Sequence, residues 1–205
     1  MCRQKYNSDG PISDQPSVAA NRANILLGVT GGIAAYKAVD LASKLTASGM
    51  KVRTVMTGSA QRFVTAKSFE TVTNSPVFTD LWTAPQEIHT AHISFLDWAD
   101  IVVIAPATAN IIAKMACGVC DDLLSTTLCA CWSKPMLFAP AMNNNMWENP
   151  AVQRNVEQLR KAGVELIGPA VGRLACGTKA IGRLSEPQDI LKAIEKIVER
   201  IKPQK

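Results

Sequence analysis

The sequence lacks the features of a membrane, secreted or nucleic-acid-binding protein. No apolar run among its 205 residues approaches the roughly 20 residues that a membrane span requires. Residues 1–24 are polar and contain no apolar segment of the kind found in a secretory signal, so we expect a disordered extension there. Lys and Arg number 22 against 17 Asp and Glu, and the only dense basic cluster is residues 196–205. We therefore expect no membrane partner and no nucleic-acid partner.

Metal-ligand patterns are also weak. There are two histidines and six cysteines, and cysteines in a chain without a signal indicate reduced thiols in a cytoplasmic protein. Cys117 and Cys120 form a C-x-x-C pair, and Cys129 and Cys131 lie close behind in the sequence. No histidine is near them, and helical geometry would turn Cys129 and Cys131 to different faces. We expect buried thiols and no metal.

Strand and helix patterns alternate along the rest of the chain. Short apolar runs predict strands at 25–29, 51–56, 76–78, 101–105, 135–139 and 164–167. Longer periodic runs predict helices at 36–48, 60–71, 110–117, 122–132, 151–162 and 187–201. Regular alternation predicts an α/β fold with a doubly wound parallel sheet, a three-layer Rossmann-like or flavodoxin-like architecture, as a single domain over residues 25–205.

A glycine-rich turn follows the first predicted strand. Residues 28–36 contain Gly31 and Gly32 after Thr30, and such a turn lets backbone N–H groups approach a phosphate at the start of a helix. The spacing matches neither G-x-G-x-x-G nor the Walker pattern. Taken alone, an anion site and a tight turn that needs glycine are about equally supported.

Three further loops at predicted strand or helix ends carry small and hydroxyl side chains with few charges. This composition suits a mononucleotide with one phosphate and a large planar ring. The candidate residues are Thr57, Ser59, Thr108, Ala109, Asn110 and Ser125.

Residues 140–147 read P-A-M-N-N-N-M-W directly after a predicted buried strand. Ligands collect at the carboxyl ends of strands in open α/β sheets. Asn143 and its neighbouring amides can donate and accept hydrogen bonds, while Met142, Met146 and Trp147 can cover apolar surface. An ordinary Asn-rich turn is the alternative, but the flanking Pro and Met-Trp favour a binding loop.

Two more segments carry candidate chemistry. His92 precedes an apolar helical pattern, and a histidine titrates near neutral pH, whereas His89 is expected to be structural. Residues 172–187 place Cys176 between glycines, with Arg173, Lys179 and Arg183 nearby, which could lower the pKa of the thiol on a flexible flap. A surface loop with an incidental cysteine is the alternative.

Together these motifs resemble the homo-oligomeric flavin-containing cysteine decarboxylase family. The likeness covers roughly residues 25–201 and rests on P-x-M-N-x-x-M-W, the histidine segment, the glycine turn, the other small-residue loops and the flap G-x-L-A-C-G. Ala180 and Leu184 depart from the family, which usually has Gly and Met at these positions. In bacteria the domain is commonly fused to a ligase, so we expect either a monofunctional enzyme or a fragment of a fusion.

The resemblance implies FMN as cofactor and a cysteinyl carboxylate as substrate. The expected reaction converts 4′-phosphopantothenoylcysteine to 4′-phosphopantetheine in coenzyme A biosynthesis, by oxidation to a thioaldehyde, loss of CO2 and reduction of the enethiolate. FMN would contact Met142 and the loop residues Thr30, Gly31, Gly32, Thr57, Ser59, Thr108, Ala109, Asn110 and Ser125.

The resemblance also implies the catalytic roles. His92 would act as base, Asn143 would hold the carboxylate and Cys176 would return a proton. Substrate would further contact Met146, Arg173 and Ala175.

Three other functions use related sequences. A peptidyl-cysteine oxidative decarboxylase would stop at the enethiol, and the Cys176 flap argues against it. A flavin prenyltransferase relative lacks P-x-M-N-x-x-M-W, and a non-enzymatic flavin-binding regulator would often lose His92 or carry acidic tails. The family assembles as trimers or dodecamers, so a homo-oligomer with sites between subunits is expected.

Overall fold

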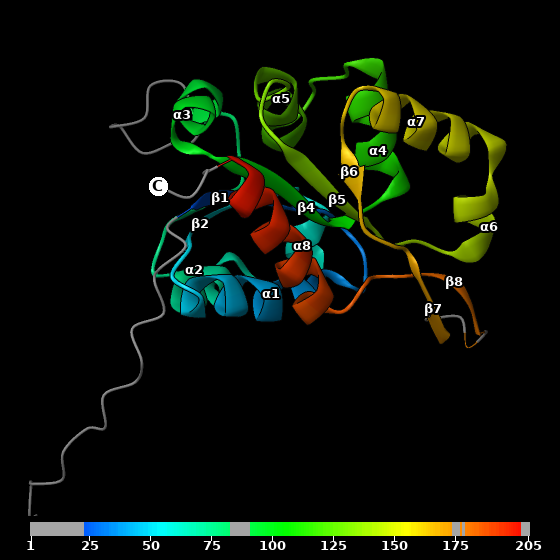
Figure 1. Ribbon diagram of the computed structural model, residues 1–205, viewed down its shortest axis with the longest axis horizontal. Helices are drawn as coiled ribbons and strands as arrows, with labels where there is room; N and C mark the ends of the chain where they lie inside the picture. Colours follow the sequence, from blue (N-terminus) through cyan, green and yellow to red (C-terminus); the bar gives the residue numbers. More distant parts are fainter. Residues whose placement is uncertain (1–22, 83–90, 174–176, 178, 202–205) are drawn as a thin grey trace, which may run out of the picture.

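The fold is built on a six-stranded parallel sheet (Figure 1). The computed structural model describes residues 23–82, 91–173, 177 and 179–201, with the backbone only for residues 91–93. The strand order is β3-β2-β1-β4-β5-β6, with β1 at Asn24–Val29, β2 at Lys51–Met56, β3 at Val77–Phe78, β4 at Ile101–Ala107, β5 at Met136–Pro140 and β6 at Glu165–Leu166. This order confirms the predicted doubly wound sheet.

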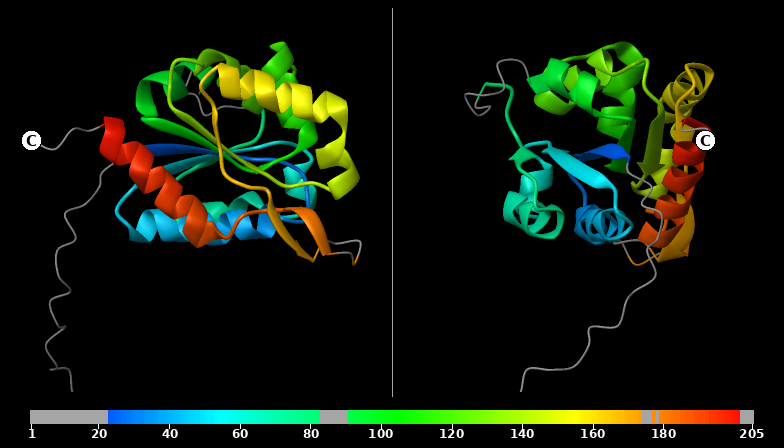
Figure 2. Two further views of the ribbon diagram at one scale, coloured as in Figure 1. Left: turned by 45° about the vertical axis from the view of Figure 1, so that its right-hand side comes forward. Right: turned by 60° about the vertical axis from the view of Figure 1, so that its left-hand side comes forward.

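Helices cover both faces of this sheet and complete a three-layer arrangement (Figures 1 and 2). One face packs on α1 (Ala35–Ala47), α2 (Ala66–Thr73) and α8 (Pro187–Ile201). The other packs on α3 (Ala91–Trp98), α4 (Ala109–Cys117), α5 (Leu123–Ala130) and α7 (Pro150–Lys161). Strands β4 and β5 are buried along their whole length, as strands covered on both faces must be.

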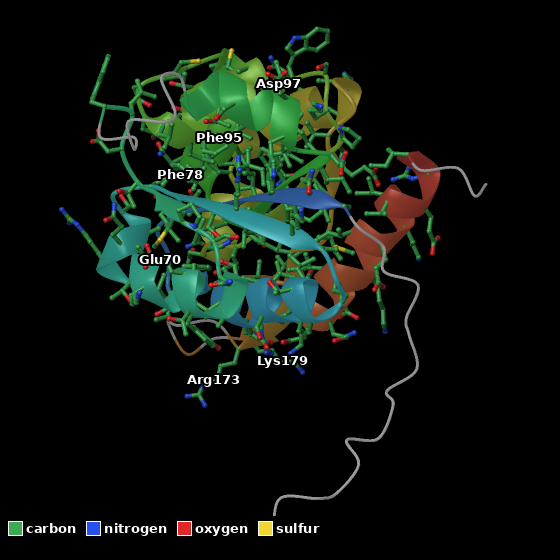
Figure 3. The ribbon with its side chains drawn as sticks, turned by 90° about the vertical axis from the view of Figure 1, so that its left-hand side faces the viewer. Glu70, Phe78, Phe95, Asp97, Arg173 and Lys179 are labelled. Carbon is green, nitrogen blue, oxygen red and sulfur yellow. The ribbon has the colours of Figure 1, made fainter. Side chains whose placement is uncertain are left out.

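Each layer has its own apolar core. On the α3 side, the rings of Phe78 and Phe95 meet edge to face with centroids 4.8 Å apart (Figure 3). At the end of β1 a side chain at Gly28 would collide with Ile104 and Leu124, so glycine lets α5 approach the sheet closely. No helix among the described residues is long and apolar enough to cross a membrane.

Two local predictions were wrong. The helix expected at 60–71 is a 3₁₀ turn, η1 (Ala60–Arg62), followed by α2, since the chain breaks its helical path near Thr65. The loop 140–147 contains a short helix, α6 (Asn144–Glu148), because Asn143 supplies its N-cap.

The predicted flap, residues 172–187, includes most of a hairpin that the sequence did not predict. Strand β7 (Ala170–Arg173) pairs antiparallel with β8 (Lys179–Arg183), and α8 begins at Pro187. Much of the predicted 1–24 extension lies outside the described residues, and β1 begins one residue earlier than predicted.

Candidate functional site

A pocket of about 730 Å³ lies where the strand order reverses between β1 and β4. In doubly wound sheets this crevice at the carboxyl ends of the strands is where ligands bind. Its lining brings together the glycine turn after β1, the end of β4, the loop after β5 and the β7–β8 hairpin. Of the residues predicted from sequence, those in the lining are Gly31, Gly32, Thr108, Met142, Asn143, Met146 and Arg173.

The glycine turn is held tightly against its neighbours. A β-carbon on Gly31 would collide with Ser59, so the turn packs on the loop after β2. The Thr30 hydroxyl is buried; it donates to the Pro106 carbonyl at 2.7 Å and accepts the Thr108 N–H at 3.2 Å. Thr30 therefore ties the end of β1 to the end of β4, a structural task that the sequence did not indicate.

The other small-residue loops surround this turn. The Thr57 hydroxyl accepts the Ala60 N–H at 3.2 Å, and Ser59 is exposed beside Gly31. Thr108 is the N-cap residue of α4, which begins at Ala109, and Asn110 is exposed. These residues stand at helix starts near the crevice, where backbone N–H groups favour an anion.

Ser125 takes part in a capping box at the start of α5. The Asp122 carboxylate accepts the Ser125 N–H at 2.8 Å, and the Ser125 hydroxyl accepts the Asp122 N–H at 3.1 Å. Lys114 contacts Asp122 at 2.7 Å. Burial works to raise the pKa of Asp122, but the bonds from Lys114 and Ser125 outweigh it and hold that pKa below its ordinary range.

The loop after β5 presents both polar and apolar groups. Asn143 caps α6, with its side-chain oxygen accepting the Asn145 N–H at 2.9 Å. Met142 is half-buried and Met146 is 48% exposed in the pocket lining. Trp147 is buried in the core instead of lining the pocket, so it anchors α6.

The hairpin docks on this loop through Gly182. The Met142 N–H donates to the Gly182 carbonyl at 2.9 Å. Gly182 has φ +135°, and a β-carbon there would collide with the Met142 carbonyl oxygen. Only glycine permits this approach, which closes one side of the pocket.

A charged network joins the hairpin to α1. Lys37 Nζ contacts both oxygens of Glu186, at 3.0 and 3.1 Å, and Arg183 Nη2 contacts Glu186 Oε1 at 2.6 Å. The bond from Lys37 holds the pKa of the Glu186 carboxyl below its ordinary range. Sequence reasoning missed this network, although the position of Lys37 in the first turn after the glycine motif was an available signal.

Four predicted residues lie wholly or partly outside the described part of the chain. His92 lies in the first turn of α3, but only its backbone is described. Cys176 and Ala175 lie outside the described residues, as does His89. Their roles remain predictions.

The prediction of buried thiols was wrong for three of the four cysteines in the α4–α5 region. Cys117, Cys120 and Cys129 are exposed, and Cys131 alone of the four is buried. Burial raises the pKa of Cys131 to about 11, which suppresses its reactivity. Burial and a hydrogen bond with Cys129 raise the pKa of Cys120. No group of three or more potential ligands within the described ranges is arranged to hold a metal.

The arrangement suits a ligand that is partly flat and apolar and partly anionic. Glycines and alanines leave space against the backbone, Met142 and Met146 offer apolar contact, and three cations stand in the lining. Gly31, Gly32, Thr108 and Met142, four of the residues predicted to contact the flavin, line this pocket.

Comparisons with known proteins show the family and the fold of this chain. The family model described as "Flavoprotein" matches residues 13–199. The coenzyme A biosynthesis bifunctional protein CoaBC of Bacillus subtilis (strain 168) is 47% identical over 176 residues, which are 86% of this chain and 43% of that protein. The chain therefore spans less than half the length of this curated relative.

Two solved structures are similar over nearly their whole length. A mutant PPC decarboxylase complexed with pantothenoylaminoethenethiol superposes with a TM-score of 0.80 and 35% identity, covering 87% of this chain and 99% of the other. The FMN-binding protein AtHal3 gives a TM-score of 0.77 and 35% identity, covering 87% and 98%.

The α5 cap predicts a pH-dependent stability difference. Asp122→Ala removes both the cap and the Lys114 contact and should lower the free energy of unfolding by roughly 1–2 kcal/mol at pH 7. Asp122→Asn keeps a good cap and should lose roughly 0.5–1 kcal/mol. Because the folded-state pKa is lowered, the charge contribution is present above pH 3.8, the ordinary Asp value, and fades as pH falls through the folded-state pKa. Urea unfolding of the wild type and of Asp122→Asn at pH 3–7 measures this contribution. A difference in unfolding free energy between the two proteins that stays constant over this pH range would contradict the role given to the Asp122 charge.

The Gly182 contact predicts a local opening. Gly182→Ala should displace β8 from the Met142 loop and speed amide hydrogen exchange at Met142 at least about tenfold, since its acceptor moves away. Gly163→Ala is the control, because Gly163 also has positive φ (+88°) but no atom within 4 Å of an added β-carbon. Equal exchange at Met142 in both variants would show that the docking contact is dispensable.

Proposed function

The chain belongs to the flavoprotein family, and on this premise we propose that it is an FMN-dependent decarboxylase of 4′-phosphopantothenoylcysteine in coenzyme A biosynthesis. The observation that carries the proposal is the meeting of the glycine turn with the P-x-M-N-x-x-M-W loop in one pocket at the switch point of the sheet. The product would be 4′-phosphopantetheine. The activity makes the protein a carboxy-lyase.

The residues present fit FMN. Gly32 leaves the backbone open beside the start of α1, a helix with no acidic residue in its first turn, so a phosphate meets no repulsion there. Thr57, Ser59, Thr108, Ala109, Asn110 and Ser125 stand at neighbouring helix starts or caps. Met142 would cover apolar ring surface. When bound, FMN supplies the two-electron acceptor and donor that a cysteinyl decarboxylation requires.

The chain's own groups would bind substrate and move protons. Asn143 would hold the substrate carboxylate through its amide nitrogen, which is the hydrogen-bond donor of this side chain. Met146, Arg173 and Ala175 would contact the rest of the substrate. His92 would take a proton at the start, and Cys176 would return one to the enethiolate at the end.

We propose a homo-oligomer, a trimer or dodecamer, working in the cytoplasm. Ile33, Tyr36 and Met146 line the pocket, yet they are 63%, 60% and 48% exposed. Large apolar side chains exposed beside a site favour burial against a second subunit. The pocket would then be completed by a neighbouring copy.

A direct test uses the purified protein. We expect visible flavin absorption, FMN as the ligand released by acid, and CO2 with 4′-phosphopantetheine from 4′-phosphopantothenoylcysteine. Asn143→Asp should keep FMN and lose CO2 release, because it places one carboxylate against another. A colourless protein indifferent to FMN would refute the proposal.

Cys176→Ser separates the two halves of the reaction. The variant should bind FMN and still release CO2, because decarboxylation precedes the proton that Cys176 returns. A hydroxyl is a much weaker acid than a thiol, so an enethiol lighter than the normal product by two hydrogen atoms should accumulate, as mass spectrometry would detect. Normal yields of 4′-phosphopantetheine would show that this cysteine is incidental.

A further inference from the structure

The pocket lining carries positive charge from α1 and from the hairpin. It contains Lys37, Arg173 and Arg183, and none of its described residues is a carboxylate. Arg173 extends from the hairpin away from the body of the protein, as does Lys179, which does not line the pocket (Figure 3). Lys37 and Arg183 are the cations tied into the fold.

Glu186, which does not line the pocket, forms ion pairs with both Lys37 and Arg183. Lys37 on α1 and Arg183 at the end of β8 both contact this carboxylate, which directly precedes α8. The Lys37 side chain is only 12% exposed, so its position is restricted by packing as well as by charge. The Arg183 side chain lies along Gly172, where a β-carbon would be 2.7 Å from Arg183 Cδ. Both groups are therefore positioned before any ligand arrives.

The network keeps donors and charge for a ligand. The Lys37 ammonium has three N–H donors and contacts the two carboxylate oxygens of Glu186. The Arg183 guanidinium has five N–H donors and contacts Glu186 through one of its nitrogens. Two positive groups and one negative group leave a net positive charge, and Arg173 adds another nearby. A phosphomonoester, with a charge of about −1.5 to −2 at neutral pH, complements this better than a neutral group would.

We propose that Lys37 and Arg183, oriented by Glu186, form the subsite for the phosphomonoester group of the substrate. The inference rests on the proposed function, which supplies a phosphorylated substrate. FMN also has a phosphate, but Glu186 holds the two cations at the β8–α8 junction, whereas Gly31 of the glycine turn packs on Ser59 in the loop after β2. Asn143, Met146 and Arg173, the proposed substrate contacts, line the pocket together with this pair.

The test compares 4′-phosphopantothenoylcysteine with pantothenoylcysteine, which lacks the phosphate. Lys37→Met and Arg183→Met should each lower the ratio of kcat/KM values for these two substrates at least about tenfold, mainly through a higher KM for the phosphorylated one. Lys37→Arg should restore part of the ratio, because it keeps the charge. Lys179→Met is the matched control, since it removes one charge from the same hairpin outside the pocket and should leave the ratio unchanged.

The outcomes separate the subsite from the function. Wild-type protein that decarboxylates both substrates equally well would overturn the subsite and leave the proposed function intact, whereas activity on neither would overturn both. The affinities of apoprotein for FMN and riboflavin identify the phosphate that is bound. We expect Lys37→Met to change the FMN-to-riboflavin affinity ratio less than twofold. A tenfold fall in that ratio would assign the cations to the flavin phosphate and overturn the proposal.

Discussion

The shape of the pocket depends on the close approach of β8 to the loop after β5 at Gly182. The Met142 N–H bonds to the Gly182 carbonyl, and no β-carbon fits between the two chains. This contact holds the hairpin against the capped α6 helix and leaves Met142 and Asn143 facing the glycine turn across the crevice. Without it, the sheet would offer strand ends and helix starts but no second wall.

Two other ties set the opposite side of the crevice. The Thr30 hydroxyl joins the ends of β1 and β4, and the glycine at position 31 lets that turn pack on Ser59. Glu186 then connects α1 with the hairpin through Lys37 and Arg183. Short polar contacts, and glycines that allow close approach, thus hold elements far apart in the sequence around one cavity. The two apolar cores supply most of the stability.

The sequence predicted what depends on local pattern. Aliphatic runs such as 101–105 identified the parallel strands, and the P-x-M-N-x-x-M-W motif identified the family and the lining residues Met142, Asn143 and Met146. It did not predict the β7–β8 hairpin, whose short strands carry glycine and charge and whose pairing partner is set by the tertiary fold. The Lys37–Glu186 contact spans 149 positions, so no local pattern contains it.

Five of the sixteen residues that line the pocket have little or no side chain, namely Gly31, Gly32, Ala34, Ala141 and Gly182. Alanine-scanning mutagenesis, which deletes side-chain atoms, cannot deepen such a surface and leaves the two alanines unchanged. The informative experiment at these positions is the reverse scan, in which side-chain volume is added stepwise. Natural variants that impair this protein should likewise be enriched in small-to-large replacements along the crevice. At these sites the harm comes from added atoms and not from a lost contact.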